Sequence, residues 1–338
     1  MEQLQDPIEQ AAWSEYLHYG SEAYHARNTA RRALGELTIH YYDGDDTGEA
    51  WVVGTINNRH PNNPFVEHDY DPGSLTLQEI RQHFETYLDQ TPKNRQTIIV
   101  EGGFESATFS SLETSIAQGA EAGMLSYLGR QSNVDVLSGE PTDQAVYADM
   151  EARGVERLEI VALSAIRHFG VLARRKQLDP VDVALDLYEV AANVGVEGFH
   201  LVSDDEKSRL DASGEMPQKI QEITDRVIED LLPNLNETTS EVLKGNDLYN
   251  LRDGRVAINI YSDPTDGEAV EEELLPLWHP DSTGRLSEVW RINAVSRDMS
   301  LFLSIVRAVN NDKNPFVVFG GPHIVCLEPV LAKYFTLQ

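Results

Sequence analysis

The chain has 338 residues, which is enough to bury a large core as one big domain or as two modest ones. Its apolar content of 41% and charged content of 25% are typical of a soluble globular protein. The formal net charge of −29 disfavours nonspecific binding to nucleic acid or to an anionic membrane, so neither is an expected partner.

A single cysteine, Cys326, excludes both an intrachain disulfide and a cysteine-rich zinc site. It lies in the apolar segment HIVCLEPVL, which predicts a buried, inert thiol rather than a nucleophile. The sequence does not open with a basic-then-apolar leader, and no apolar run approaches membrane-spanning length. The expected location is therefore cytoplasmic, and the oligomeric state stays open.

The first third of the chain predicts a helical segment followed by a hairpin. Residues 1–34 are expected to be helical, either packed on the domain or in contact with another subunit. Two strand patterns follow, over 37–42 and 50–56, joined by an Asp-Gly-Asp-Asp turn. The second strand runs into a loop rich in Asn and Pro, where Asn57 and His60 are polar candidates; ordinary turn chemistry is the alternative.

Helix and strand patterns then alternate. The expected elements are, in order, a helix over 75–88, a strand over 97–100, a helix over 111–130 and a strand over 134–137. The first of these strands stops at Glu101 and the second ends near Glu140. A buried carboxylate is costly unless it is paired or bound to a metal, which favours Glu101 as a site residue. The alternation implies a mostly parallel sheet flanked by helices, and hence an α/β fold.

The carboxyl-terminal stretch reads as helix, turn, strand, glycine-rich bend and helix. Apolar residues recur at helical spacing over 299–309, and Pro315 bars that helix from continuing. The wholly apolar run 316–319 predicts a strand covered on both faces. His323 then follows the strand's carboxyl end, where ligands collect in open α/β sheets. A structural histidine that only bonds the loop is the alternative.

The second half of the chain is harder to interpret. Residues 142–196 have helical patterns, whereas residues 197–294 have no clear organisation. The predicted domains are an N-terminal helical segment over 1–34 and a single α/β domain over 35–338. Within that domain, a helical or irregular insertion is expected at 197–294.

Several of these strand ends, taken in chain order, form a recognisable series. The series consists of Gly54-Thr55-Ile56-Asn57, Ile99-Val100-Glu101, the helix residue Glu121 followed by Glu140-Pro141, Arg297-Asp298, and the G-x-x-H motif that ends at His323. It resembles the superfamily that joins the TraB pheromone-shutdown proteins, the Tiki membrane proteases, the ChaN-like lipoproteins and the erythromycin esterases, with the TraB-like branch closest. The resemblance spans residues 50–153 and 295–335.

The resemblance implies hydrolysis of peptide or ester bonds, with metal dependence in the protease-like branch. The catalytic residues that it implies are Glu101, Glu140, Arg297 and His323. The ligands that it implies for a divalent metal ion are Glu101, Glu121, His323 and His60. The family has a histidine where this chain has Asn57, and asparagine is a poor ligand for transition metals and no general base. His60, three residues later, is the histidine that can take its place.

The physical argument for a site is independent of the resemblance. Glu101, Glu140 and His323 each follow an apolar strand, so a parallel sheet brings them to one edge. An imidazole with two carboxylates can hold a divalent ion, or one glutamate can act as general base to a water molecule. Arg297 can stabilise an oxyanion or hold a glutamate; if it only pairs with a neighbour, it is scaffold.

Two functions follow as hypotheses. The first is a hydrolase that acts on a peptide or small-molecule substrate, with Glu101 and His323 central. The alternative is a non-catalytic relative that binds a small ligand or a partner protein, which the loss of histidine at Asn57 favours. The first hypothesis expects His323 in a solvent-reached cleft, so that His323→Ala removes activity and leaves stability nearly intact.

Overall fold

A mixed sheet forms the centre of one of the two compact units of this chain. The computed structural model describes residues 4, 6–19, 21–34, 37–44, 48–55, 75–104, 108–157, 159–161, 163–164, 189–196 and 285–337. These fall into two compact units, one made of residues 1–142 with 294–338 and the other of residues 143–293. The sheet belongs to the first unit.

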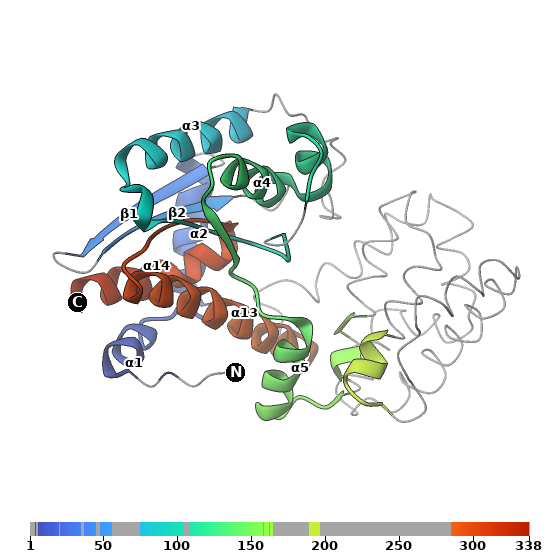
Figure 1. The fold of residues 1–338 in the computed structure, drawn as a ribbon. Coiled ribbons are helices and arrows are strands. Elements are labelled where there is room, and N and C mark those ends of the chain that lie inside the picture. The colour runs from blue at the N-terminus through green and yellow to red at the C-terminus, as the bar shows by residue number, and fades with distance from the viewer. Residues whose placement is uncertain are drawn as a thin grey trace, which may run out of the picture. The chain divides into compact units, whose positions relative to one another are not determined.

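Five strands make up this sheet, in the order β1-β2-β5-β3-β4 (Figure 1). Their bounds are Leu37–Gly44 for β1, Gly48–Thr55 for β2, Gln96–Val100 for β3, Asp135–Ser138 for β4 and Asn314–Gly320 for β5. The β1–β2 hairpin is antiparallel and the other pairings are parallel. The predicted mostly parallel sheet is confirmed, and Val100 pairs directly with Val318.

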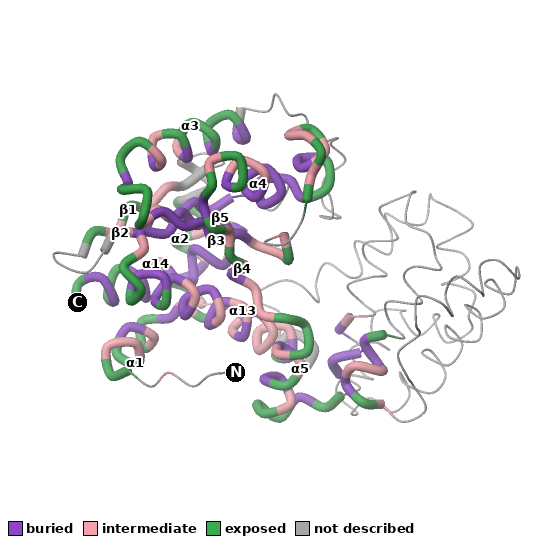
Figure 2. Tube along the Cα trace, viewed as in Figure 1, coloured by how far each residue is buried: buried purple, intermediate pink, exposed green. Residues whose placement is uncertain are grey.

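Two helices cover one face of the sheet. They are α3, Leu75–Gln90, and α4, Leu112–Gln131 (Figure 1). Phe84 and Tyr87 of α3 pack with Met124 of α4 on Phe316 and Val318 of the central strand. All seven residues of β5 are buried, as expected of a strand covered on both faces (Figure 2).

The opposite face is covered by helices from the two ends of the chain. They are α1, Pro7–Trp13, α2, Glu22–Leu34, α13, Arg285–Asn310, and α14, Gly321–Leu337 (Figure 1). Helices α1 and α2 contact α14, so the N-terminal segment packs on its own domain. The segment contains two helices rather than one, and the described residues 14–19 between them are not helical.

Helix α4 contains a break at Ala120, whose φ of 50° and ψ of −132° are not helical. Residues other than glycine rarely adopt this conformation, and each one that does lowers the stability of the fold by about 1–3 kcal/mol. Just beyond the break, a Cβ added to Gly123 would lie 2.1 Å from the carbonyl oxygen of Ser115. The small residues of this helix therefore permit a close approach of its own two halves.

The second unit contributes α5, Asp143–Ala152, and parts of further helices. Within it, Arg157 donates to Glu151 at 2.7 Å and to the carbonyl oxygen of Gly195 at 3.1 Å. The predicted insertion at 197–294 lies outside the described residues except for 285–294, which are helical. Among the described helices, none combines the length and the apolar character needed to cross a membrane.

Candidate functional site

Arg297 of α13 joins two carboxylates that follow neighbouring strands. Its Nη2 donates to Oε1 of Glu101 at 3.1 Å and also to Oε1 of Glu140. Glu101 comes directly after β3, and Glu140 comes two residues after β4. Because β3 and β4 are parallel neighbours, their carboxyl ends deliver both glutamates to one edge of the sheet. The expected contact between Arg297 and a strand-end carboxylate is present.

Backbone groups fix Glu101 further. Its second oxygen, Oε2, accepts the backbone N–H of Gly320 at 2.7 Å, at the end of the central strand. Glu101 thus links β3, β5 and α13 through both of its oxygens. The turn before Glu140 is closed by Ser138, whose hydroxyl accepts the Glu140 N–H at 3.2 Å and lies 3.0 Å from the carbonyl oxygen of Gly102.

Within the trio formed by Glu101, Glu140 and Arg297, some hydrogen-bond donors and acceptors have no partner among the described residues. Arg297 makes both bonds through Nη2, and no described residue accepts from its Nε or Nη1. Nothing among the described residues donates to Oε2 of Glu140. The side chains of Glu101, Glu140 and Arg297 remain 21%, 20% and 19% exposed, so solvent reaches them. A guanidinium with unused N–H groups beside a carboxylate can bind and polarise a carbonyl oxygen.

The next residue of α13, Asp298, enters a buried network. Its Oδ1 lies 2.5 Å from Nδ1 of His323, and its Oδ2 accepts the hydroxyl of Tyr16. The Tyr19 hydroxyl lies 3.0 Å from the same nitrogen of His323. Asp298 is fully buried and His323 is 6% exposed. A buried carboxylate requires such partners, because an unpaired charge in the interior is costly.

The tyrosines and Cys326 of this network keep their protons. Burial raises the pKa of Tyr16 and Tyr19 well above the ordinary tyrosine value, and the negative charge of Asp298 raises both further. The same two causes, burial first, raise the pKa of the Cys326 thiol. The hydroxyls are therefore hydrogen-bond donors, and the predicted buried, inert thiol agrees with this environment.

The structure differs from the sequence-based expectation for His323. A solvent-reached cleft was expected, but the histidine is buried in the first turn of α14, with Asp298 and Tyr19 as its partners. The reason lies in the N-terminal segment: the break between α1 and α2 inserts Tyr16 and Tyr19 over this turn. His323 therefore follows a strand at the same edge of the sheet as Glu101, but its side chain contacts Asp298 and Tyr19.

Of the remaining predicted ligands, Glu121 lies among the described residues and His60 does not. Glu121 is a buried residue of α4, directly after the break at Ala120. Asn57 and His60 lie outside the described residues. Within the described ranges, no group of three or more His, Cys, Asp or Glu side chains is placed to hold a metal ion.

The described residues therefore do not fit a divalent ion. The guanidinium of Arg297 already lies between the carboxylates of Glu101 and Glu140, where a cation would bind. Asp298 contacts Nδ1 of the His323 imidazole, so this nitrogen already has a partner within the protein. The full ligand set of Glu101, Glu121, His323 and His60 stays a prediction, because His60 lies outside the described residues.

Sequence reasoning named the Arg297-Asp298 pair but gave Asp298 no role in the site, and it missed Tyr16 and Tyr19. Asp298 offered a signal, since it lies at helical spacing from the buried Leu301 and Phe302. An acid on the apolar stripe of a helix requires a buried partner. No comparable signal exists for the tyrosines, because aromatic residues in an amphipathic segment are ordinary core residues.

Comparisons of the chain with protein-family models, with curated proteins and with solved structures found no match.

Proposed function

We propose that this chain is a hydrolase of peptide or ester bonds, of the type that its resemblance to the TraB and Tiki superfamily implies. One observation carries the proposal: Glu101, Glu140 and Arg297 come from three separate parts of the sequence and meet at the carboxyl edge of a parallel sheet. In open α/β sheets this edge is the usual place for ligands. The substrate is a peptide or a small ester.

Glu140 is the general base in this proposal. Its Oε2 takes a proton from a water molecule while the water oxygen bonds to the carbonyl carbon of the substrate. The carbon–nitrogen or carbon–oxygen bond then breaks, and the leaving amine or alcohol receives the proton back from Glu140. The products are a carboxylic acid and an amine or alcohol.

Arg297 stabilises the oxyanion that forms during this attack. Its Nε and Nη1 groups have no acceptor among the described residues, so they are the donors that a developing negative charge would meet. Glu101 holds the guanidinium in place, because its own second oxygen is fixed by Gly320. Glu101 is thus a positioning residue.

His323 has a positioning role as well. It pairs with Asp298, the residue after Arg297, and so ties the start of α14 to α13 beside the trio. This differs from the central catalytic role expected from the sequence. The same observation favours the alternative function, a non-catalytic relative that binds a small ligand or a partner protein, since a buried histidine contributes to stability.

The test is hydrolysis by the purified chain of a casein digest and of p-nitrophenyl butyrate, in water enriched in ¹⁸O. Cleavage should place one ¹⁸O atom in each new carboxyl group. Glu140→Gln should lower the rate by about 10²-fold or more, because the amide cannot take the proton. Glu85→Gln on α3 is the matched control, since Glu85 pairs with Arg81 on the helix surface. A rate that is equal in wild type and Glu140→Gln would contradict the proposal.

A further inference from the structure

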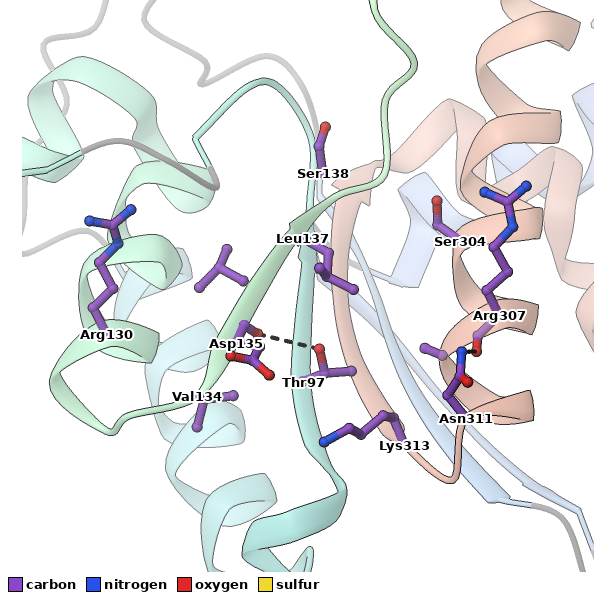
Figure 3. Close-up of a pocket in the computed structure, with 12 residues that line it drawn as sticks. Thr97, Arg130, Val134, Asp135, Leu137, Ser138, Ser304, Arg307, Asn311 and Lys313 are labelled. Atoms are coloured by element: carbon purple, nitrogen blue, oxygen red, sulfur yellow. Dashed lines mark hydrogen bonds between the residues drawn. The ribbon is translucent and has the colours of Figure 1, made fainter.

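A cationic groove runs along the outer edge of β4. It encloses about 750 Å³ between β4, the end of α4 and the last turns of α13. Arg130 lies on α4 on one side of the strand, and Arg307 lies on α13 on the other side, with Lys313 nearby (Figure 3). These are three cations against one acid, Asp135, among the described lining residues. The charge of this patch is opposite in sign to the net charge of the whole chain, which is −29.

The backbone of β4 offers hydrogen-bonding groups to this groove. Gly139 donates its N–H inward, to the carbonyl oxygen of Val100 at 2.9 Å. Successive strand residues direct their backbone groups to alternate sides, so Val136 and Ser138 direct theirs to the outer edge. β4 is the last strand of the sheet, and no described strand pairs with its outer edge, on the side away from β3. An edge of this kind is a template for a further strand.

The two faces of β4 differ at this edge. Val136 lies against the core under α4, whereas Leu137 points to the α13 side and is 43% exposed. An added strand would place alternate side chains on the two faces. One set would meet Arg130, and the other would meet Leu137 and Arg307.

We propose that this groove binds an acidic protein segment in extended conformation, which pairs with β4 as an additional strand. Backbone hydrogen bonds to Val136 and Ser138 give the pairing, and the arginines on the two sides of the strand select acidic side chains. A second copy of this chain fits less well, because two positively charged edges would then face each other. The inference concerns binding and holds whether or not the chain hydrolyses anything.

The test is fluorescence anisotropy of labelled TVEEVET, a strand-forming peptide with acids on both faces, added to the full chain. Binding should saturate and weaken with added salt. Val136→Pro, which removes an outward N–H, should weaken it about tenfold, the change that loss of one hydrogen bond produces. Val136→Ala keeps that N–H and should bind as wild type. Arg307→Glu should also weaken binding about tenfold, whereas Arg81→Glu on α3 should not. Circular dichroism of each variant checks that it folds.

Several outcomes would overturn the proposal. They are the absence of saturable binding at about 1 mM chain, equal affinity for TVKKVKT or for TPEEPET, and unchanged affinity of Arg307→Glu. Displacement of the peptide by an equal concentration of inorganic phosphate would show a small-anion site instead. A dimer of the free chain that Val136→Pro dissociates would show pairing between copies.

Discussion

Arg297 and Asp298 are consecutive residues of α13, and they have entirely different partners. Arg297 pairs with the carboxylates that follow β3 and β4, and Asp298 pairs with His323 at the start of α14. Consecutive helix residues point about 100° apart. The rotation of α13 about its axis is therefore set by two polar contacts at once, a partly exposed ion pair and a buried hydrogen bond.

The pairing of Arg297 with Glu140 should be visible as a coupling free energy. We expect Arg297→Gln to lower the free energy of unfolding by about 2 kcal/mol, because two partly buried carboxylates lose their shared partner. The double variant with Glu140→Gln should lose less than the sum of the single variants, with a coupling of about 1 kcal/mol or more. Urea denaturation measures all four proteins. Strict additivity would show that this pair does not interact in solution.

His323→Ala should destabilise the fold, contrary to the expectation from sequence. Removal of the imidazole takes a hydrogen-bond partner from the fully buried carboxylate of Asp298. Breaking a buried pair in this way costs about 3–5 kcal/mol. His83→Ala on α3, a partly exposed histidine, should change stability by less than about 0.5 kcal/mol. Equal urea midpoints for the two variants would contradict the buried network.

Stability should fall at alkaline pH. The pKa of Tyr16 and of Tyr19 is raised in the folded chain above the ordinary value of 10.0, so above that pH the unfolded chain binds fewer protons than the folded one. The free energy of unfolding then decreases with rising pH, by up to about 1.4 kcal/mol per pH unit for each buried tyrosine. Below pH 10 this contribution is fully present.

Chemical denaturation at pH 9, 10 and 11 measures this slope. The phenylalanine of Tyr16→Phe cannot ionise, so the free energy of unfolding should fall less steeply with pH, by the contribution of one tyrosine. A slope that is the same in wild type and Tyr16→Phe would place Tyr16 in solvent.

Two glycines, one in α4 and one after Glu101, should respond differently to substitution by alanine. In Gly123→Ala the new Cβ would lie 2.1 Å from the carbonyl oxygen of Ser115, so α4 must shift. A loss of about 1–3 kcal/mol is expected from such overpacking. At Gly103 an added Cβ meets no atom within 4 Å, and Gly103→Ala should be neutral or slightly stabilising. Thermal unfolding compares the two, and similar midpoints would disprove the close approach within α4.

The sequence by itself determined the strands and their direction. The apolar runs at Thr97–Val100 and Phe316–Phe319 are long enough for a strand and too short for a helix, and amphipathic helices separate them. Connections of that kind produce parallel pairing, which places Glu101 and Glu140 at one edge. Proximity of strand ends is a consequence of local pattern, so it could be predicted.

Only the tertiary structure decided which of these polar groups would be covered. The local pattern around His323 describes a strand end, and a strand end can be open or buried. The burial of His323 depends on Tyr19, a residue of the N-terminal segment that lies 304 residues away in the sequence and hydrogen-bonds the imidazole. Arg297 and Asp298 are likewise alike in the sequence as charged helix residues. Which one reaches solvent and which one is buried follows from the packing of α13 against the sheet and α14, because burial is a property of contacts between distant segments.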